Sequence, residues 1–511
     1  MFAMATVVTA AVLLSPAYLV LRAAESGAIW ELLSQDTTVK ALVRTLWLTV
    51  AVTFSSAVVA VPLAWLTVRT DLPFRDVLSA LLALPLAIPS FVGGFVTVSA
   101  LGPGGMLQDV LSPFGVERLP SLYGFKGSWL TLTFLSYPYI YLPVRAALKR
   151  ADPALEEASR SLGKTAFETF RRVNLPQLRP ATSAGAILLA LYVLSEFGAV
   201  SMLRYDTLTP LVYIQYTTSF DRASAAVLGL PLITLAVLFV ALDGITRGQA
   251  RYHAGGQRRP ALMLSLGAWR WPALAVCLLV VGLGLGMPVA VIVYWLAKGL
   301  SQGESTSFLL TAVLNSARVA GVAAVLAVAA SLPVAILSVR YSGWLSSLLE
   351  KASYSGQSLP GITIALSLVF FAANYLTPVY QTLGLLVFAY VVRFLPEALG
   401  ACRSAMLQVS PHTEEVARGL GAGKLRVFLR VTAPQILPGM TAGALLVFLT
   451  SMKELPITLL LSPIGFNTLA TQIWSSTSEA FFTQAALPSL LLVLLSGIAV
   501  MLLLRRERLE A

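Results

Sequence analysis

Residues 152–163 read DPALEEASRSLG and residues 410–421 read SPHTEEVARGLG, so one pattern occurs twice in this chain of 511 residues. In both stretches two glutamates precede a glycine, and a proline follows the glycine after the same interval. Glycine readily adopts the left-handed backbone conformation that ends many helices. We therefore predict a short helix, a turn at Gly163 and a second short helix, and the same unit again around Gly421.

The repeat extends on both sides of these stretches. Arginines and prolines recur at a nearly constant offset, and the small change in that offset is absorbed by a longer loop in the first half. The matched pairs are Pro62 with Pro333, Arg69 with Arg340, Pro89 with Pro360, Pro138 with Pro396, Arg145 with Arg403, and Pro176 with Pro434. The chain is thus two copies of one unit.

The composition places both copies in a membrane. The chain is 57% hydrophobic and only 12% charged, with a mean hydropathy of +0.80, whereas about a quarter of the residues of a soluble protein are charged. Apolar runs long enough to cross a bilayer, about 20 residues each, recur near 4–22, 41–67, 77–101, 127–149, 181–203, 223–246, 271–297, 309–339, 353–374, 380–402, 438–461 and 482–504. We expect the first run to be a retained helix and not a cleaved signal peptide, because it lacks a basic segment before it.

These spans predict an all-α integral membrane protein with about twelve transmembrane helices in two parallel six-helix repeats. The repeats run in the same direction because each has an even number of spans, and a pathway between them is expected. The predicted parts are a first repeat over 1–246, a cytoplasmic linker over 247–270 and a second repeat over 271–511. The cores of the repeats are 41–246 and 309–504, which leaves spans one and seven as additions. The linker is rich in Gly, Gln and Arg and is expected to be a flexible join.

The positive charges indicate the orientation. Arginine and lysine collect in the linker, in the loop after span four and in the C-terminal tail. By the positive-inside rule these segments and both termini face the cytoplasm. The same rule explains the net charge of +12, so no nucleic-acid partner is expected. Two cysteines and two histidines are too few for a metal-cluster signature, and we assign no metal site.

The duplicated loop resembles the EAA loop of ATP-binding-cassette (ABC) importer permeases, in which Glu-Ala-Ala is followed at fixed spacing by Gly and then by Leu-Pro. The chain departs from that pattern at Ser159, Val416, Arg418, Gly419 and Ala433, and it keeps both glycines and both prolines. The alternative is a loop that merely seals the helix bundle. The residues that match are Glu157, Ala158, Gly163, Leu175, Pro176, Glu415, Ala417, Gly421 and Pro434.

This resemblance implies the type I importer permease fold, in a bacterial plasma (inner) membrane. It also implies that each loop inserts into a cleft on a nucleotide-binding subunit, so the partners would be two ATPase copies and an extracytoplasmic solute-binding protein. The chain contains no G-x-x-x-x-G-K-[S/T] loop to cradle phosphates. ATP and Mg are therefore expected on the separate ATPase subunits, and this chain is expected to bind no cofactor and to catalyse no reaction itself.

Two acidic residues fall inside predicted spans at equivalent positions, Glu196 in span five and Glu454 in span eleven. A charge inside a membrane is costly, so each is a functional hypothesis by default. Carboxylate oxygens suit a hard cation. The alternative is a pair of structural hydrogen-bond anchors. Gly198 and Pro456 are expected to break the helices locally beside these acids.

Two further groups are candidates for the substrate pathway. Arg393 and Glu397 lie four residues apart, so we expect an ion pair within one helix, with a cargo site at Glu397 as the alternative. Tyr137, Tyr139 and Tyr141 offer phenol oxygens that would suit ferric iron, although aromatic packing is the favoured interpretation. We retain Tyr139 as a pathway candidate.

The cargo follows only from resemblance. Residues 195–199 (SEFGA), 452–461 (MKELPITLLL) and 465–470 (GFNTLA), together with the fusion of both halves, look like the ferric-iron permease group. This implies import of ferric iron from a binding protein by alternating access. The alternatives are the same role for thiamine, polyamine or another small solute, and a secondary transporter of the major-facilitator type. Sulfate and molybdate permeases share the core as well. Co-purification of an ATPase would separate the ABC permease from the secondary transporter.

Overall fold

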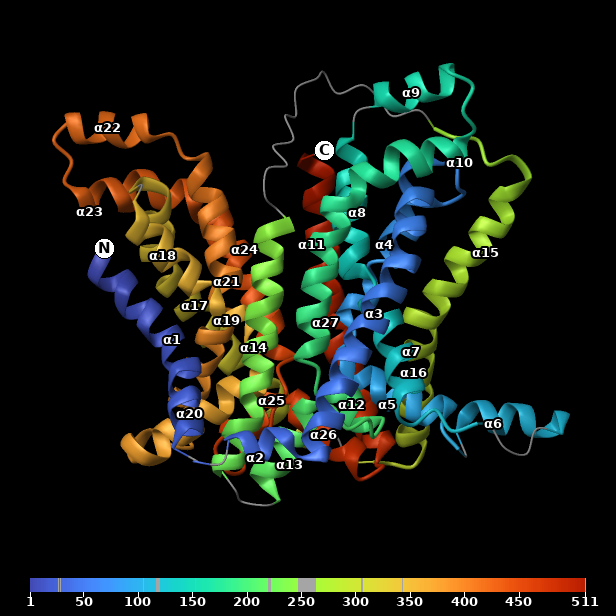
Figure 1. Ribbon diagram of the computed structural model, residues 1–511, viewed down its shortest axis with the longest axis horizontal. Helices are drawn as coiled ribbons and strands as arrows, with labels where there is room; N and C mark the ends of the chain where they lie inside the picture. The colour runs from blue at the N-terminus through green and yellow to red at the C-terminus, as the bar shows by residue number, and fades with distance from the viewer. Residues whose placement is uncertain are drawn as a thin grey trace. The chain divides into compact units, whose positions relative to one another are not determined.

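The computed structural model describes residues 1–25, 27, 29–103, 105–115, 120–151, 153–218, 222–246, 263–304, 307–341 and 343–510. Within these ranges the chain is built of helices without any β-strand, as Figure 1 shows. This confirms the predicted all-α class. Residues 247–262 of the predicted linker, and Asp152 in the first loop, lie outside the described residues.

Ten helical segments of the described chain are long and apolar enough to cross a membrane, where twelve were predicted. The predicted span at 127–149 is two helices, α7 (Phe125–Ser136) and α8 (Pro138–Arg150), because Pro138 has no N–H to continue the first one. In the predicted span at 353–374 the long apolar helix is α20 (Gly361–Tyr375), which is too short to be counted as a candidate membrane span. The ten are Phe2–Ala24, Asp36–Arg69, Ser90–Asp109, Phe167–Leu194, Ser224–Leu242, Gly267–Ser301, Phe308–Arg340, Leu383–Gln408, Lys424–Met452 and Phe482–Leu502.

The chain folds as two compact units, and each unit takes segments from both halves of the sequence. Unit 1 comprises 1–38, 211–233 and 305–475. Its main helices are α1 (Phe2–Ala24), α2 (Ile29–Ser34), α13 (Leu208–Thr217), α17 (Ser307–Arg340), α18 (Trp344–Ser353), α19 (Ser355–Ser358), α20, α21 (Leu383–Gln408), α22 (Pro411–Gly419), α23 (Lys424–Val427), α24 (Ala433–Met452), α25 (Pro456–Leu461) and most of α26 (Leu469–Ser478).

Unit 2 comprises 39–210, 234–304 and 476–511. The helix α14 (Arg222–Thr246) crosses from one unit to the other. The other helices of unit 2 are α3 (Asp36–Arg69), α4 (Arg75–Leu81), α5 (Ser90–Leu101), α6 (Met106–Leu111), α7, α8, α9 (Pro153–Ser161), α10 (Ala166–Thr169), α11 (Leu175–Leu194), α12 (Gly198–Met202), α15 (Arg270–Val281), α16 (Met287–Ser301) and α27 (Phe482–Glu510).

The two additional spans therefore pack against the opposite repeat. In unit 1, α1 from the first half contacts α17, α18 and α20 of the second-half core. Polar contacts help to hold it there: for example, Thr9 Oγ1 lies 3.0 Å from Ser353 Oγ, and Ser367 donates to the Ser15 carbonyl at 2.6 Å. In unit 2, α16 from the second half contacts α5 of the first-half core as well as α27 of its own half.

A short backbone pairing brings the second half into unit 2. The Leu264 N–H donates to the Arg69 carbonyl at 2.9 Å, and the Asp71 N–H donates back to the Leu264 carbonyl at 3.1 Å. The Asp71 carboxylate also accepts the Leu266 N–H at 2.8 Å and the Ser265 hydroxyl. These hydrogen bonds lower the pKa of Asp71, the one from Leu266 most strongly. The last part of the predicted linker is thus fastened to the end of α3 before α15 begins.

Candidate functional site

Both predicted loops form two short helices joined by a glycine turn, as Figure 1 shows for α9 with α10 and for α22 with α23. Gly163 has a φ of 78° and Gly421 a φ of 83°. In the first loop the Lys164 N–H donates to the Ser159 carbonyl at 3.3 Å, and the Gly163 N–H donates to the Arg160 carbonyl at 2.9 Å. This is the Schellman arrangement. The second loop repeats it with Ala422 bonded to Ala417 and Gly421 bonded to Arg418.

The first loop has a further stabilising element at the start of α10. The Thr165 N–H donates to the Glu168 carboxylate at 3.1 Å, and the Glu168 N–H donates to the Thr165 hydroxyl at 3.2 Å. Together they form a capping box. The backbone hydrogen bond from Thr165 lowers the pKa of Glu168. The second loop has Gly423 at the corresponding position and no such box.

Each loop exposes several large apolar side chains. Large side chains are exposed there, up to 79% for Leu162 and 85% for Leu420. Exposed apolar patches of this kind mark interaction surfaces. In the first loop Phe167 is exposed, whereas Phe170 packs on Trp65 with ring centroids 5.3 Å apart. The exposed set is Leu155, Leu162 and Phe167 in the first loop, and Val416, Leu420, Leu425 and Leu429 in the second.

The glutamates that hold the loops in place are not the two that the motif selects. Glu157 and Glu415 are exposed, whereas the preceding Glu156 and Glu414 are buried. Arg69 Nη2 lies 3.0 Å from Glu156 Oε1, and the Asn174 amide donates to the same oxygen at 3.2 Å. Burial raises the pKa of the Glu156 carboxyl, and the charge of Arg69 offsets part of that rise. Arg69 also donates to the Ala151 carbonyl at 3.3 Å.

The second loop has the same anchor at equivalent positions. Arg340 Nη2 lies 3.1 Å from Glu414 Oε1, the Thr432 hydroxyl donates to that oxygen at 3.0 Å, and Arg340 also donates to the Val409 carbonyl at 3.0 Å. Arg418 adds a second pairing, at 3.3 Å from Glu414 Oε2. Each anchor ties the first helix of the loop to the end of a long membrane helix. The duplicated Arg and Glu positions were a sequence signal for it, but spacing alone could not choose between two adjacent glutamates.

The prolines of the motif have a different role from the one usually expected after a helix. Pro176 and Pro434 do not end the second loop helix, because they lie in the first turns of α11 and α24. A π-turn, Phe170–Asn174 or Phe428–Thr432, joins each loop helix to the span that follows it. Proline has no N–H to donate, and the π-turn directly before each proline is where the regular α-helical hydrogen bonding is interrupted. Both prolines and Leu175 are exposed.

The helices break beside both buried acids, as predicted. The helix α11 ends at Leu194 and α12 begins at Gly198, while α24 ends at Met452 and α25 begins at Pro456. Glu196 and Glu454 lie in these breaks and are buried. The Glu196 carboxylate accepts the Ala199 N–H at 2.8 Å, and the Glu454 carboxylate accepts the Ile457 N–H at 3.3 Å. Each acid thus caps the short helix after its break, which is an anchoring role.

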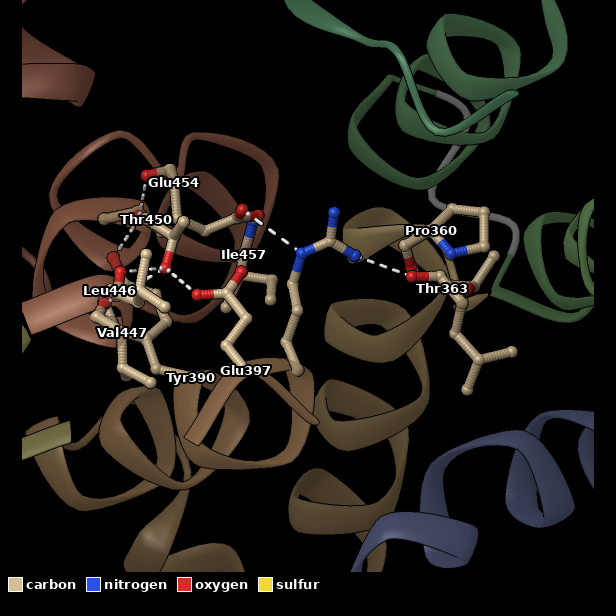
Figure 2. Close-up of polar contacts among 12 residues, drawn as sticks. Pro360, Thr363, Tyr390, Glu397, Leu446, Val447, Thr450, Glu454 and Ile457 are labelled. Carbon is tan, nitrogen blue, oxygen red and sulfur yellow. Dashed lines mark hydrogen bonds and ion pairs between the residues drawn. The ribbon is translucent and has the colours of Figure 1, made fainter. Parts of the chain in front are cut away.

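The second-half acid is also neutralised by a cation. Figure 2 shows Glu454 facing an arginine, and Arg393 Nε lies 3.3 Å from Glu454 Oε2. Arg393 also donates to the Leu359 carbonyl at 2.6 Å. The predicted pair of Arg393 with Glu397 is therefore not the one that forms. Arg393 pairs with Glu454 because the helix break after α24 brings Glu454 next to α21. Glu397 instead accepts the Thr450 hydroxyl at 2.9 Å.

The first-half acid has phenols and hydroxyls around it where the second half has charges. Tyr192 and Ser90 lie beside the Glu196 carboxylate. Tyr139, at the position that corresponds to Glu397, packs on Tyr192 with ring centroids 5.1 Å apart. Leu135 occupies the position that corresponds to Arg393. Glu196 therefore has Tyr192 and Ser90 beside it, and Tyr139 lies against the ring of Tyr192.

The other two tyrosines of this helix have structural roles. The Tyr137 hydroxyl donates to the Leu82 carbonyl at 2.7 Å, and the Tyr141 hydroxyl donates to Ser79 at 3.1 Å. Both side chains are fully buried in the apolar core of unit 2. Aromatic packing is therefore confirmed for these two, and only Tyr139 remains a candidate.

The chain was compared with known proteins. A family model described as "Binding-protein-dependent transport system inner membrane component" matches residues 58–251 and 327–509, one match in each half. The Fe(3+)-transport system permease protein FbpB 2 of Haemophilus influenzae is 37% identical over 498 residues, covering 95% of this chain and 94% of the relative. The sulfate transport system permease protein CysT of Synechococcus elongatus is 30% identical over 234 residues, covering 44% of this chain and 83% of the relative.

Proposed function

The chain belongs to the family of binding-protein-dependent transport system inner membrane components, and from this premise we propose that it is the permease of an ABC importer for ferric iron. The observation that supports iron is the similarity to the Fe(3+) permease, which extends over 95% of the chain. The similarity to the sulfate permease covers only 44% of the chain. A fused chain with two coupling loops needs no second permease subunit.

We propose two copies of an ATPase subunit as partners, one for each loop. The apolar residues around Gly163 and Gly421 are exposed on both loops, and burying them in a cleft of a partner would be favourable. ATP and Mg would bind to those subunits and not to this chain. The loops and both termini would face the cytoplasm, in agreement with the positive-inside rule, and a ferric-binding protein would dock on the opposite side.

Transport would follow alternating access. Closure of the ATPase subunits on ATP would pull the two loops together. The anchors at Glu156 and Glu414 support this role, because each passes movement of a loop helix to the end of a long membrane helix, α3 or α17. The cavity would then open outward, receive the cargo and reset after hydrolysis.

We propose further that the first half provides the main cargo contacts. Glu196 and the neighbouring phenol of Tyr192 offer oxygen ligands, the type that hard cations prefer, and Tyr139 packs on Tyr192. Glu454 is already paired with Arg393, so its charge is less available to a cation. Glu397, which accepts a hydrogen bond from Thr450, is the remaining acidic candidate in the second half.

The test is ATPase stimulation in liposomes that contain this chain and its ATPase. A ferric-binding protein is added with and without iron, and a thiamine-binding and a polyamine-binding protein are the comparisons. Stimulation by the iron-loaded protein alone supports iron import. Stimulation by another loaded protein, with none by the iron-loaded one, leaves the ABC role standing and contradicts the cargo.

The matched pair Glu196→Gln and Glu454→Gln then tests the asymmetry. We expect Glu196→Gln to reduce iron-dependent stimulation by roughly tenfold or more, the effect of losing a contact worth about 1.4 kcal/mol. Glu454→Gln should act mainly on stability. Equal effects of both variants on transport, at equal stability, would contradict the first-half assignment.

A further inference from the structure

A groove with a volume of about 720 Å³ runs between α17 and α21 in unit 1. The two helices lie side by side, as Figure 1 shows. The walls of the groove are apolar, and Arg318 is the one charged residue that lines it. The main wall residues are Val322, Leu326, Ala330, Leu383, Val387 and Phe388.

Arg318 interrupts an apolar stripe that faces away from the protein. Leu310, Leu314, Val322 and Val325 are exposed on α17 at helical spacing, and Arg318 lies among them. On a membrane helix such a stripe faces lipid. No described residue forms an ion pair with Arg318. A lipid-facing arginine is costly at the centre of the bilayer, whereas an arginine near the end of a membrane helix can reach the headgroup region.

The depth of Arg318 matches the headgroup region of one leaflet. Arg340 ends α17 at the anchor of the second loop, and Arg318 lies about 33 Å before it along the helix at roughly 1.5 Å per residue. That separation is close to the thickness of the hydrocarbon core, about 30 Å. From Arg318 to Ala330 the groove extends roughly 18 Å along the helix, which is about the depth of one leaflet. It therefore begins at an interface and ends near the middle of the bilayer.

The first half fills the corresponding place with aromatic side chains. Trp47, Phe125 and Trp129 occupy the positions that correspond to Arg318, Leu383 and Val387. Trp129 stacks on Phe125 at a centroid distance of 6.4 Å and an angle of 6°, and its N–H donates to Ser55 at 2.9 Å. Trp47 contacts Phe125 at 6.2 Å. The groove in unit 1 exists because smaller side chains replace two of these aromatic residues and an arginine replaces the third.

We propose that this groove is a binding site for one anionic phospholipid of the leaflet opposite the coupling loops. An acyl chain would lie along the apolar walls, and the phosphate would pair with Arg318, whose planar guanidinium suits bidentate phosphate contacts. The site is independent of the cargo, so failure of the iron assignment would not affect it.

The experiment measures lipid retention by the purified full-length chain in its complex with the ATPase. Native mass spectrometry follows binding of phosphatidylglycerol, with phosphatidylcholine as the comparison. We expect one tightly held phosphatidylglycerol per chain. Arg318→Gln should weaken its binding by roughly tenfold to a hundredfold, the effect of losing charge-assisted hydrogen bonds. Arg318→Lys should retain part of the binding.

The groove itself is tested by filling it. Val387→Trp introduces the residue that the first half has at this position and should abolish the tight lipid while Arg318 remains. Val325→Trp is the matched control, because Val325 is exposed on α17 and does not line the groove, so it should leave binding unchanged. Equal retention by Val387→Trp and the wild type, or equal binding of both lipids, would overturn the proposal. The comparison of Val387→Trp with Val325→Trp tests the lipid site even if Arg318→Gln fails to insert into the membrane.

Discussion

At the scale of single residues, the turn glycines are required for their backbone and not for space. Gly163 and Gly421 have positive φ, and a Cβ at either position would meet no atom within 4 Å. The restriction on substitution is therefore conformational. Asparagine tolerates this conformation far better than alanine does, so the two substitutions separate strain from bulk.

We expect the double variant Gly163→Ala, Gly421→Ala to insert normally but to lose most transport, because each turn is strained by about 1–2 kcal/mol. The double Asn variant should retain most of it. Uptake of radioactive iron into vesicles, normalised to the amount of protein in the membrane, is the measurement. If the Ala and Asn variants transport equally well, the left-handed turn is not what coupling requires.

A second prediction at this scale concerns the ion pair in Figure 2. Arg393→Met would leave Glu454 buried without a counter-charge, which costs about 3–5 kcal/mol. Adding Glu454→Gln should restore much of that stability. Thermal unfolding in detergent of the two single variants and the double variant gives the coupling energy. If the stability losses of the two single variants simply add up in the double variant, the Arg393–Glu454 pair contributes no interaction energy to stability.

At the scale of elements, a buried ion pair joins each duplicated loop to the end of a long membrane helix. Arg69 is 1% exposed, so its pair with Glu156 is shielded from water. We therefore expect a loop fastened in this way to move together with its helix. The same arrangement recurs at Arg340 and Glu414, which makes the anchor a property of the repeat.

We expect Arg69→Met to loosen the first loop, because it leaves a buried carboxylate unpaired. Trypsin should then cut faster at Arg160 and Arg171, which are exposed on that loop. Adding Glu156→Gln should slow cleavage again, since a neutral amide needs no counter-charge and can still accept from Asn174. Cleavage in the second loop is the internal control and should not change. Unchanged cleavage in Arg69→Met would show that the anchor does not hold the loop.

At the scale of the whole molecule, each compact unit is assembled from both halves of the sequence. Unit 1 contains α1 from the first half, and unit 2 contains α15, α16 and α27 from the second. Neither half therefore contains a complete unit. Because both repeats are parts of one chain, the two halves that each unit needs are always produced in equal numbers.

We expect the halves, produced as separate polypeptides ending and beginning within 247–262, to be stable only together. Each half alone would expose the apolar surfaces that the other half covers in its unit. Affinity capture of a tagged first half, with and without the second half, is the measurement. Two halves that are each monodisperse and stable alone would contradict the shared units.

The sequence by itself determined the membrane class, the internal repeat, the glycine turns and the breaks beside Glu196 and Glu454. These features depend on composition, spacing and the backbone preferences of glycine and proline, all of which are local. The family model, which matches once in each half, and the similarity to an Fe(3+) permease agree with the predicted membrane class and internal repeat. The roles of Glu157, Ala158, Ala417 and the other loop residues in coupling, and of Glu397 and Tyr139 on the pathway, stay predictions.

Only the tertiary structure decided which glutamate is buried, which acid Arg393 pairs with, and which repeat each additional helix packs against. Glu156 and Glu157 are adjacent and chemically identical, so their difference arises from Arg69, far away in the chain. Arg393 pairs with Glu454 and not with the nearer Glu397 because a helix break brings distant segments together. Such choices are made by packing between elements remote in sequence, and no local pattern encodes them.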